Sequence, residues 1–268
     1  MITKKYRIVI KIGSSSLTDQ YGFLSQKKLE HHVKEIIKLL KAGHEVVLVS
    51  SGAVAAGFHL LGFEERPETI EGKQAAAAIG QGLLIQAYSE AFQKYHYTVA
   101  QILLTRNDFS NQKQYHYAYR TLSMLIKHGI IAIINENDTV AIDELTFGDN
   151  DQLSALVAGL IHADILLLLT DIDGLYYSDP RTNPNAKKIT YLEEITSQIE
   201  DIASENGSKF GTGGMKSKIS AAKLALSFGV GVYIGKAITK YSFLDIIQGQ
   251  GEGTYIGRSL LHQEISEA

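Results

Sequence analysis

The sequence predicts an α/β fold, a three-layer α/β/α sandwich around an open, mainly parallel sheet. Short runs rich in β-branched and aliphatic residues alternate with helical patterns along the chain. Strands separated by helices favour parallel pairing through right-handed crossovers. One run, DILLLLTD at 164–171, is apolar throughout, as is typical of a strand covered on both faces.

The first part of the chain gives a regular succession of expected elements. A β-branched run predicts a strand at 6–12, and an amphipathic pattern that begins with a serine cap predicts a helix at 25–41. A second strand follows at 44–52. An alanine-rich segment predicts a long helix at 73–95, and a third strand follows at 98–105.

The middle of the chain continues the same alternation. We expect a helix over about 110–128 and a strand at 129–138, followed by a hairpin around 139–147. A helix at 150–162 then leads into the apolar strand at 164–171.

After that strand, a polar loop carries Pro180 and Pro184. Beyond the loop we expect a helix at 214–229, a strand at 230–235, a helix at 239–249 and a short strand at 253–257. The sequence contains no linker, low-complexity stretch or fixed-period repeat, so one domain over 1–268 is expected.

Composition indicates a soluble protein. A net charge of -3 gives no electrostatic footprint for nucleic acid or an anionic membrane. The absence of cysteine excludes disulfides and thiol nucleophiles and suits a reducing compartment. The apolar run Ile8–Ile10 is too short for a signal peptide or a membrane span, so we expect a cytoplasmic location.

Small and polar residues follow four of the expected strands. The segments at the carboxyl ends of these strands are Lys11-Ile-Gly-Ser-Ser, Ser50-Ser-Gly, Asn135-Glu-Asn-Asp and Thr170-Asp-Ile-Asp-Gly. Each alone is compatible with ordinary turn chemistry. Ligands of open α/β sheets bind beyond the carboxyl ends of the strands, so the four together favour a pocket there.

The glycine-rich segment 211–218 indicates an anion site, although it matches neither standard nucleotide motif. Met215 stands where the phosphate loop needs glycine, and Lys216 stands where the dinucleotide fingerprint needs one, which disfavours a dehydrogenase. Lys216 and Lys218 lie in the first turns of a helix, where a bound anion would favour them. Two solvated lysines are the alternative. Lys11 likewise either extends to water or reaches a phosphate.

Asp149 and Asp151 flank an asparagine at the start of an apolar helix, and could face a metal, a lysine or water. The calcium-loop pattern would need an oxygen ligand at Leu153, and the nine histidines form no HExxH pair. The Ser50-Ser51-Gly52 stretch is not a nucleophile elbow either, since no glycine precedes it at the required spacing. No metal site is therefore identified directly.

Taken together, these blocks resemble the amino-acid kinase family over about residues 6–260, and within it the members that phosphorylate glutamate. The motifs are Lys11-x-Gly13-[ST]-Ser, Ser51-Gly-Ala-x-Ala-Ala-Gly57, Lys73-Gln-Ala with Gly80-Gln81, Ile134-Asn-Glu-Asn-Asp138, Gly148-Asp-Asn-Asp151, Leu169-Thr-Asp171 and Gly211-Thr-Gly-Gly-Met-x-[ST]-Lys218. Many members carry a further C-terminal PUA domain of the kind found in RNA-modifying enzymes. A short form without it is expected here.

The resemblance implies a phosphotransferase with a carboxyl acceptor: ATP, with Mg²⁺, phosphorylates the γ-carboxylate of L-glutamate in the first step of proline biosynthesis. It assigns catalysis to Lys11, Lys218, Asp151 and, as a supporting acid or a metal contact through water, Asp149. It assigns glutamate binding to Ser51, Asp138 and Asn150. It assigns nucleotide binding to Lys11, Gly13, Thr170, Asp171, Thr212, Gly213, Gly214, Met215, Lys216, Ser217 and Lys218. It also implies feedback by proline and a homodimer or homotetramer.

Two other functions remain open at this stage. A sister kinase could act on acetylglutamate or aspartate, and a non-catalytic sensor could bind ATP or an amino acid. In the kinase, the carboxylate nucleophile is already ionised near pH 7, so no general base is required. We expect Lys11→Ala or Lys218→Ala to lower kcat far more than it raises KM.

Overall fold

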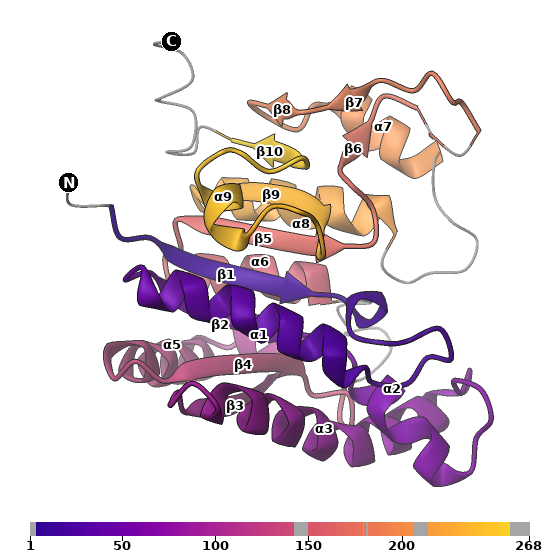
Figure 1. The fold of residues 1–268 in the computed structure, drawn as a ribbon, viewed down its shortest axis with the longest axis vertical. Coiled ribbons are helices and arrows are strands. Elements are labelled where there is room, and N and C mark those ends of the chain that lie inside the picture. The colour runs from indigo at the N-terminus through magenta and orange to yellow at the C-terminus, as the bar shows by residue number, and fades with distance from the viewer. Residues whose placement is uncertain (1–3, 142–149, 179, 181, 206–213, 258–268) are drawn as a thin grey trace.

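The fold is described by a computed structural model, which covers residues 4–141, 150–178, 180, 182–205 and 214–257 (Figure 1). Its main sheet has the strand order β3-β4-β2-β1-β5-β9-β10-β8. The strands of this sheet are β1 (Arg7–Ile12), β2 (Glu45–Ser50), β3 (Val99–Leu104), β4 (Ile131–Glu136), β5 (Ile165–Thr170), β8 (Tyr191–Leu192), β9 (Gly231–Lys236) and β10 (Thr254–Ile256).

The main sheet is parallel except where β10 pairs with β9. β1 lies at its centre, with Ile10 opposite Leu48 of β2 on one side and Leu167 of β5 on the other. After β1, the chain forms β2, β3 and β4 on one side of it and then crosses to form β5 on the other side. The polar residues that follow β1, β2, β4 and β5 therefore meet at one edge, as a switch in strand order predicts.

Helices cover both faces of the sheet, which confirms the predicted three layers (Figure 1). On one face lie α1 (Gln26–Lys41), α3 (Ile70–Gln93) and α9 (Phe243–Ile247). On the other lie α5 (Gln112–Lys127), α6 (Asn150–Leu160) and α8 (Met215–Ser227).

Side-chain alternation along β1 separates the two cores. Ile8, Ile10 and Ile12 are buried against the α1 and α3 face, and Val9 is buried in the opposite core. Because strand side chains alternate with a period of two, Lys11 points to the same face as Val9. That face carries α6 and α8.

Three short helical segments depart from the expected pattern. A stretch without a predicted element forms α2 (Ala53–Gly57) and the 3-10 helix η2 (Phe58–Leu61). The helix expected over about 110–128 is α5, and a separate short helix that was not predicted, α4 (Arg106–Ser110), precedes it. The two helices are separated at Asn111, whose Oδ1 accepts hydrogen bonds from two backbone N–H groups and so caps the start of α5.

The segment after β5 is more ordered than a polar loop. It contains the paired strands β6 (Leu175–Tyr176) and β7 (Lys188–Ile189), then β8 and helix α7 (Ser197–Glu205). Strands of two residues give no periodic signal in a sequence. The hairpin expected around 139–147 falls almost wholly outside the described residues.

Candidate active site

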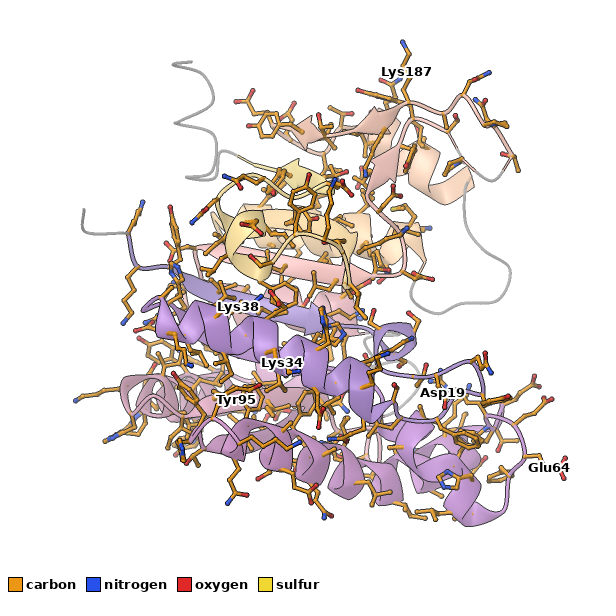
Figure 2. The ribbon with its side chains drawn as sticks, in the orientation of Figure 1. Asp19, Lys34, Lys38, Glu64, Tyr95 and Lys187 are labelled. Atoms are coloured by element: carbon orange, nitrogen blue, oxygen red, sulfur yellow. The ribbon has the colours of Figure 1, made fainter. Side chains whose placement is uncertain are left out.

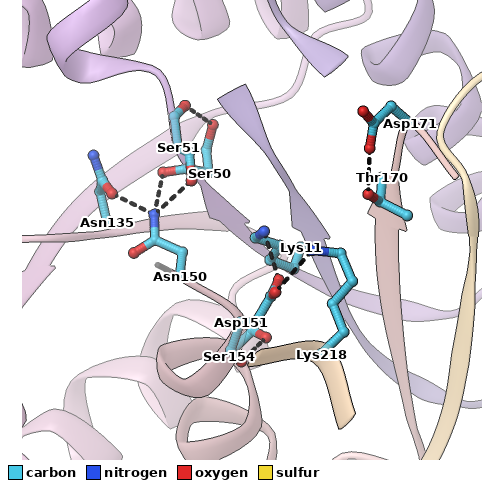
Figure 3. Close-up of polar contacts among 10 residues, drawn as sticks. All are labelled: Lys11, Ser50, Ser51, Asn135, Asn150, Asp151, Ser154, Thr170, Asp171 and Lys218. Carbon is cyan, nitrogen blue, oxygen red and sulfur yellow. Dashed lines mark hydrogen bonds and ion pairs between the residues drawn. The ribbon is translucent and has the colours of Figure 1, made fainter. Parts of the chain in front are cut away.

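Lys11, Asp151 and Lys218 form a buried trio at the carboxyl edge of the sheet (Figure 3). Lys11 Nζ lies 2.5 Å from Asp151 Oδ1, and Lys218 Nζ donates a hydrogen bond of 3.1 Å to Asp151 Oδ2. The three residues come from β1, α6 and α8. One carboxylate thus holds two ammonium groups side by side, as the resemblance predicts for these three residues.

Burial decides between the two interpretations of Lys11. The residue is only 4% exposed and Lys218 only 5%, while Asp151 is fully buried. Lys11 therefore does not extend to bulk water. A buried charge is costly unless an opposite charge or hydrogen bonds partner it, and Asp151 supplies that partner.

The electrostatics of Asp151 reflect its two neighbours. Burial alone would raise the pKa of this carboxyl group, but the attraction of Lys11 and Lys218 outweighs burial and holds the pKa below its ordinary value. Asp151 is therefore a carboxylate at neutral pH. Among the described residues it faces the ammonium groups of Lys11 and Lys218.

Asn150, directly before Asp151, organises a cluster of amides and hydroxyls (Figure 3). Its Nδ2 atom lies 2.7 Å from Asn135 Oδ1, 3.0 Å from Ser51 Oγ and 3.2 Å from the Ser50 carbonyl oxygen. Ser50, Ser51, Asn135 and Asn150 make up this amide cluster. It joins the ends of β2 and β4 to the first turn of α6.

Helix α3 supports the amide cluster from the opposite face of the sheet. Asn135 Nδ2 donates to Gln81 Oε1 at 2.8 Å, and the hydroxyls of Ser50 and Tyr88 lie 2.9 Å apart. Tyr88 was not expected at the site, and no binding role was assigned to Gln81, Ser50 or Asn135, although Ser50 and Asn135 stand at two of the polar strand ends that predicted a pocket. A polar residue within the last two positions of an apolar strand was the available signal for Ser50 and Asn135.

Asp138 follows β4 by two residues and is half-buried. Burial raises the pKa of its carboxyl group to about 6, and Arg66 opposes this rise. The group is therefore mainly ionised at pH 7 but titrates only slightly below it.

Thr170 and Asp171 lie on the other side of the trio, at the end of β5 (Figure 3). Thr170 Oγ1 donates to Asp171 Oδ1 at 2.9 Å, and the Thr170 carbonyl oxygen accepts from the Ala237 N–H at 2.9 Å. Thr170 is buried and Asp171 is exposed. This Thr170–Asp171 pair therefore presents one carboxylate to solvent beside β9.

Helix α8 begins at Met215 with Gly214, which has no side chain to serve as a cap, as its N-cap. Lys216 is exposed, Ser217 is half-buried, and Lys218 turns inward to the trio. The first turn contains no acidic residue. The N–H groups at the start of a helix and the positive end of its dipole suit an anion. Asp149, Thr212 and Gly213 lie outside the described residues.

Gly13 begins the turn that follows β1, in which Ser14–Ser16 form the 3-10 helix η1. A Cβ atom built at Gly13 would lie 3.5 Å from Lys11 Nζ and 3.9 Å from the Leu169 carbonyl oxygen. The absence of a side chain therefore keeps the space beside the Lys11 ammonium open.

Figure 3 shows the groups in sequence along the sheet edge, with the trio between the amide cluster and the Thr170–Asp171 pair. The order follows from the strand order β4-β2-β1-β5. Within the described residues, no group of three or more His, Cys, Asp or Glu side chains could hold a metal ion. Nor is any helix in those parts of the chain long and apolar enough to cross a membrane.

Comparison with known proteins agrees with this arrangement. The family model "Amino acid kinase family" matches residues 6–236. A glutamate 5-kinase of Bacillus cereus (strain G9842) is 56% identical over 256 residues, which cover 96% of this chain and 70% of the relative. A glutamate 5-kinase of Halalkalibacterium halodurans is 58% identical, over 96% of this chain and 68% of its own length.

Solved structures support the fold at lower identity. A carbamate kinase from Giardia lamblia bound to AMP-PNP superposes with a TM-score of 0.67 at 18% identity, covering 96% of this chain and 99% of its own. A UMP kinase from Bacillus anthracis gives a TM-score of 0.64 at 20% identity, covering 95% of this chain and 97% of its own. The chain therefore belongs to the amino acid kinase family, and within it to the glutamate 5-kinases.

Proposed function

We propose that this chain transfers the γ-phosphoryl group of ATP to the γ-carboxylate of L-glutamate, giving L-glutamyl 5-phosphate, the first step of proline biosynthesis. The observation that carries the proposal is the convergence of two buried ammonium groups, Lys11 and Lys218, on Asp151. Ammonium groups held side by side in a buried site suit a transferring phosphoryl group. The names of relatives at 56% and 58% identity supply the acceptor.

The mechanism needs no general base. A glutamate side chain has a pKa of about 4.3, so its γ-carboxylate is ionised at pH 7. A carboxylate oxygen forms the new bond to the γ-phosphorus, and the bond from that phosphorus to the β–γ bridging oxygen breaks, which leaves ADP. Lys11 and Lys218 stabilise the charge on the transferring group, and Asp151 fixes their direction.

The flanking groups would hold the two substrates. We assign Ser51, Asn150 and Asp138 to glutamate, with the Asp138 carboxylate facing its α-ammonium group. We assign Thr170, Asp171, Gly13 and the α8 entry with Gly214, Met215, Lys216, Ser217 and Lys218 to the nucleotide. On the resemblance alone, we also assign Thr212 and Gly213 to the nucleotide and Asp149 to catalysis. The order along the sheet edge supports an in-line transfer, since the trio lies between the two sets.

Mg²⁺ would enter this site with the nucleotide. No cluster of acids among the described residues could hold the ion by itself, so phosphate oxygens would be its main ligands. When bound, the ion neutralises charge on the β- and γ-phosphates. The trio then adds positive charge from this chain's own residues.

The direct test is ATP- and Mg²⁺-dependent formation of γ-glutamyl hydroxamate from glutamate and hydroxylamine. The parent protein is expected to give the product, and Lys11→Ala and Lys218→Ala to lower kcat about 10²- to 10³-fold with smaller changes in KM. The exposed Lys34→Ala serves as a control. A near-normal kcat in either site variant would refute the assignment of that lysine.

The same assay separates the alternatives. A sister kinase would release ADP with acetylglutamate or aspartate in preference to glutamate. A sensor would bind ATP without turnover on any of these carboxylates. Product from glutamate alone would exclude both.

We also infer a homo-oligomer, a dimer or a tetramer, in the cytoplasm. Ile79 and Leu83 lie one turn apart on α3 and are 36% and 38% exposed, so they offer an apolar contact. Sedimentation of the parent and of Leu83→Glu tests this contact, and a monomeric parent would refute it.

Proline, which shares the α-carboxylate and ammonium groups of glutamate, is inferred to inhibit by raising the KM for glutamate.

A further inference from the structure

Lys28 and His32 lie one turn apart on α1, on the side that faces the turn after β1. His32 Nε2 lies 3.0 Å from the Ser16 carbonyl oxygen. Lys28 Nζ donates to the carbonyl oxygens of Ser15, at 3.2 Å, and Thr18, at 2.6 Å. Two side chains of α1 therefore hold three carbonyl groups of one short turn.

The chemistry of His32 is that of a fixed neutral donor. A carbonyl oxygen only accepts, so Nε2 carries the hydrogen and Nδ1 does not. Burial lowers the pKa of His32 to about 4, against a smaller opposite effect of the Ser16 carbonyl, so the ring is neutral near pH 7. Nδ1 has no hydrogen-bond partner among the described residues. Leucine would fill a buried site without that cost, so packing alone does not explain a histidine here.

The turn held in this way borders the proposed reaction centre. Its backbone closes through Ser16 N to the Gly13 carbonyl oxygen at 3.1 Å and Thr18 N to the Ser14 carbonyl oxygen at 3.0 Å. At its start, the position of a Gly13 Cβ lies 3.5 Å from Lys11 Nζ. The segment Gly13–Thr18 is called the β1 turn below. Any displacement of the β1 turn changes the space beside the Lys11 ammonium.

We propose that His32 and Lys28 are positioning residues for phosphoryl transfer, which hold the β1 turn beside Lys11 through its carbonyl groups. The inference rests on the proposed kinase function. Neither residue touches the reacting atoms. Both act through the backbone of the turn, whose N-terminal end faces the site while its carbonyls face α1.

The kinetic test compares His32→Leu, which removes the donor, with His32→Gln, whose amide N–H can reach the position of Nε2. His32→Leu is expected to lower kcat about tenfold to a hundredfold, as small misplacements at a reacting centre do. It should leave the KM for glutamate within about threefold, because the amide cluster lies on β2, β4 and α6. His32→Gln should recover most of the kcat, which a loss of packing alone would not predict.

Lys28→Met is expected to lower kcat in the same direction, and the double variant His32→Leu/Lys28→Met should lose less than the product of the two single losses, since both act on one turn. Lys34→Met is the matched control: Lys34 is an exposed lysine of the same helix (Figure 2) and should keep the parent kcat. A folded His32→Leu protein with the parent kcat would overturn the proposal.

Amide hydrogen exchange gives a second readout that does not depend on turnover. The N–H groups of Ser16, Leu17 and Thr18 are bonded within the β1 turn, so they should exchange faster in His32→Leu and at the parent rate in Lys34→Met. Unchanged exchange in His32→Leu would refute the positioning role whatever the enzyme's substrate. A parent that exchanges as expected but makes no glutamyl hydroxamate would instead refute the proposed function.

Discussion

Asp151 is the residue on which the site depends most. It is fully buried, and both of its oxygens contact lysine ammonium groups. Such a residue cannot be replaced by a neutral one without leaving buried positive charge uncompensated. Its contribution to catalysis and its contribution to stability therefore have the same origin.

Asp151→Asn should impair both properties at once. The amide preserves the shape of the side chain but not its charge, so the two lysines lose their common anchor. We expect kcat to fall about 10²- to 10³-fold and the free energy of unfolding to fall by about 3 kcal/mol. Steady-state kinetics and urea unfolding measure the two effects. Glu30→Gln, which removes an exposed ion pair with Lys94, is the control; equal losses in both variants would contradict the special role of Asp151.

Asp138 should give glutamate binding a pH dependence. Its pKa is raised to about 6 by burial, so the group becomes neutral as the pH falls through 6 and no longer attracts the α-ammonium group of glutamate. We expect kcat/KM for glutamate, which reports the free enzyme, to fall below about pH 6. Asp138→Asn should be lower throughout and flat in that range. A bend at the same pH in Asp138→Asn would assign the titration to another group.

At the scale of single residues, the sequence indicated the charged trio better than the hydrogen bonds of the amide cluster beside it. Lys11 and Lys218 stand out as cations beside an apolar strand and a glycine-rich loop, and Asp151 as an acid before an apolar helix. The hydrogen bond between Asn150 and Ser51 has no signal in the sequence, because the two residues are 99 positions apart in the chain. Only the order of β4, β2 and β1 brings them together.

At the scale of elements, α2 and α3 pack closely beside the amide cluster. The two helices approach so closely that a Cβ at Gly80 would lie 1.8 Å from the Ala53 carbonyl oxygen, and one at Gly57 would lie 2.1 Å from the Ala76 carbonyl oxygen. α2 begins two residues after Ser51, through Gly52 at a φ of 110°. The position of Ser51 therefore depends on how closely these helices pack.

Gly80→Ala should separate α2 from α3 and disturb glutamate binding. We expect a loss of about 1–3 kcal/mol in unfolding free energy from overpacking, together with a raised KM for glutamate and an unchanged KM for ATP. Gly82→Ala on the same helix meets no atom within 4 Å and should stabilise the helix by about 0.5–1 kcal/mol. Thermal unfolding and kinetics of both variants test this pair. If Gly80→Ala behaved like Gly82→Ala, the close packing would have no role.

The success of prediction at this scale depends on the length of the element. Long elements such as α1 were predicted nearly in full, with Ser25 confirmed as the cap through the Lys28 N–H. α2, η2 and the strands β6, β7 and β8 are too short for a periodic signal, and tertiary contacts decide them. α4, which precedes the predicted helix α5, is likewise only five residues long, and Asn111 caps the start of α5 directly after it.

At the scale of the whole molecule, the residues proposed to bind glutamate and those proposed to bind the nucleotide lie at the two halves of the sheet, on either side of β1. The residues assigned to glutamate follow β2 and β4 or begin α6, whereas those assigned to the nucleotide follow β5 or begin α8. β1 lies between the two sides and contributes Lys11 to the trio. The parallel order that the sequence predicted is sufficient for this division, because it brings the ends of all these strands to one edge.

This division predicts that the two substrates can be weakened separately. Asp171→Asn should raise the KM for ATP about tenfold by removing a charged acceptor, with the KM for glutamate unchanged. Ser51→Ala should do the reverse, and Asn150 keeps two other acceptors in that variant, so the fold should persist. Ligand-induced shifts in melting temperature measure the same separation without turnover, since the stabilisation by each ligand grows with the logarithm of its concentration over its own Kd. If either variant weakened both ligands equally, the two sides of the sheet would not act as separate binding units.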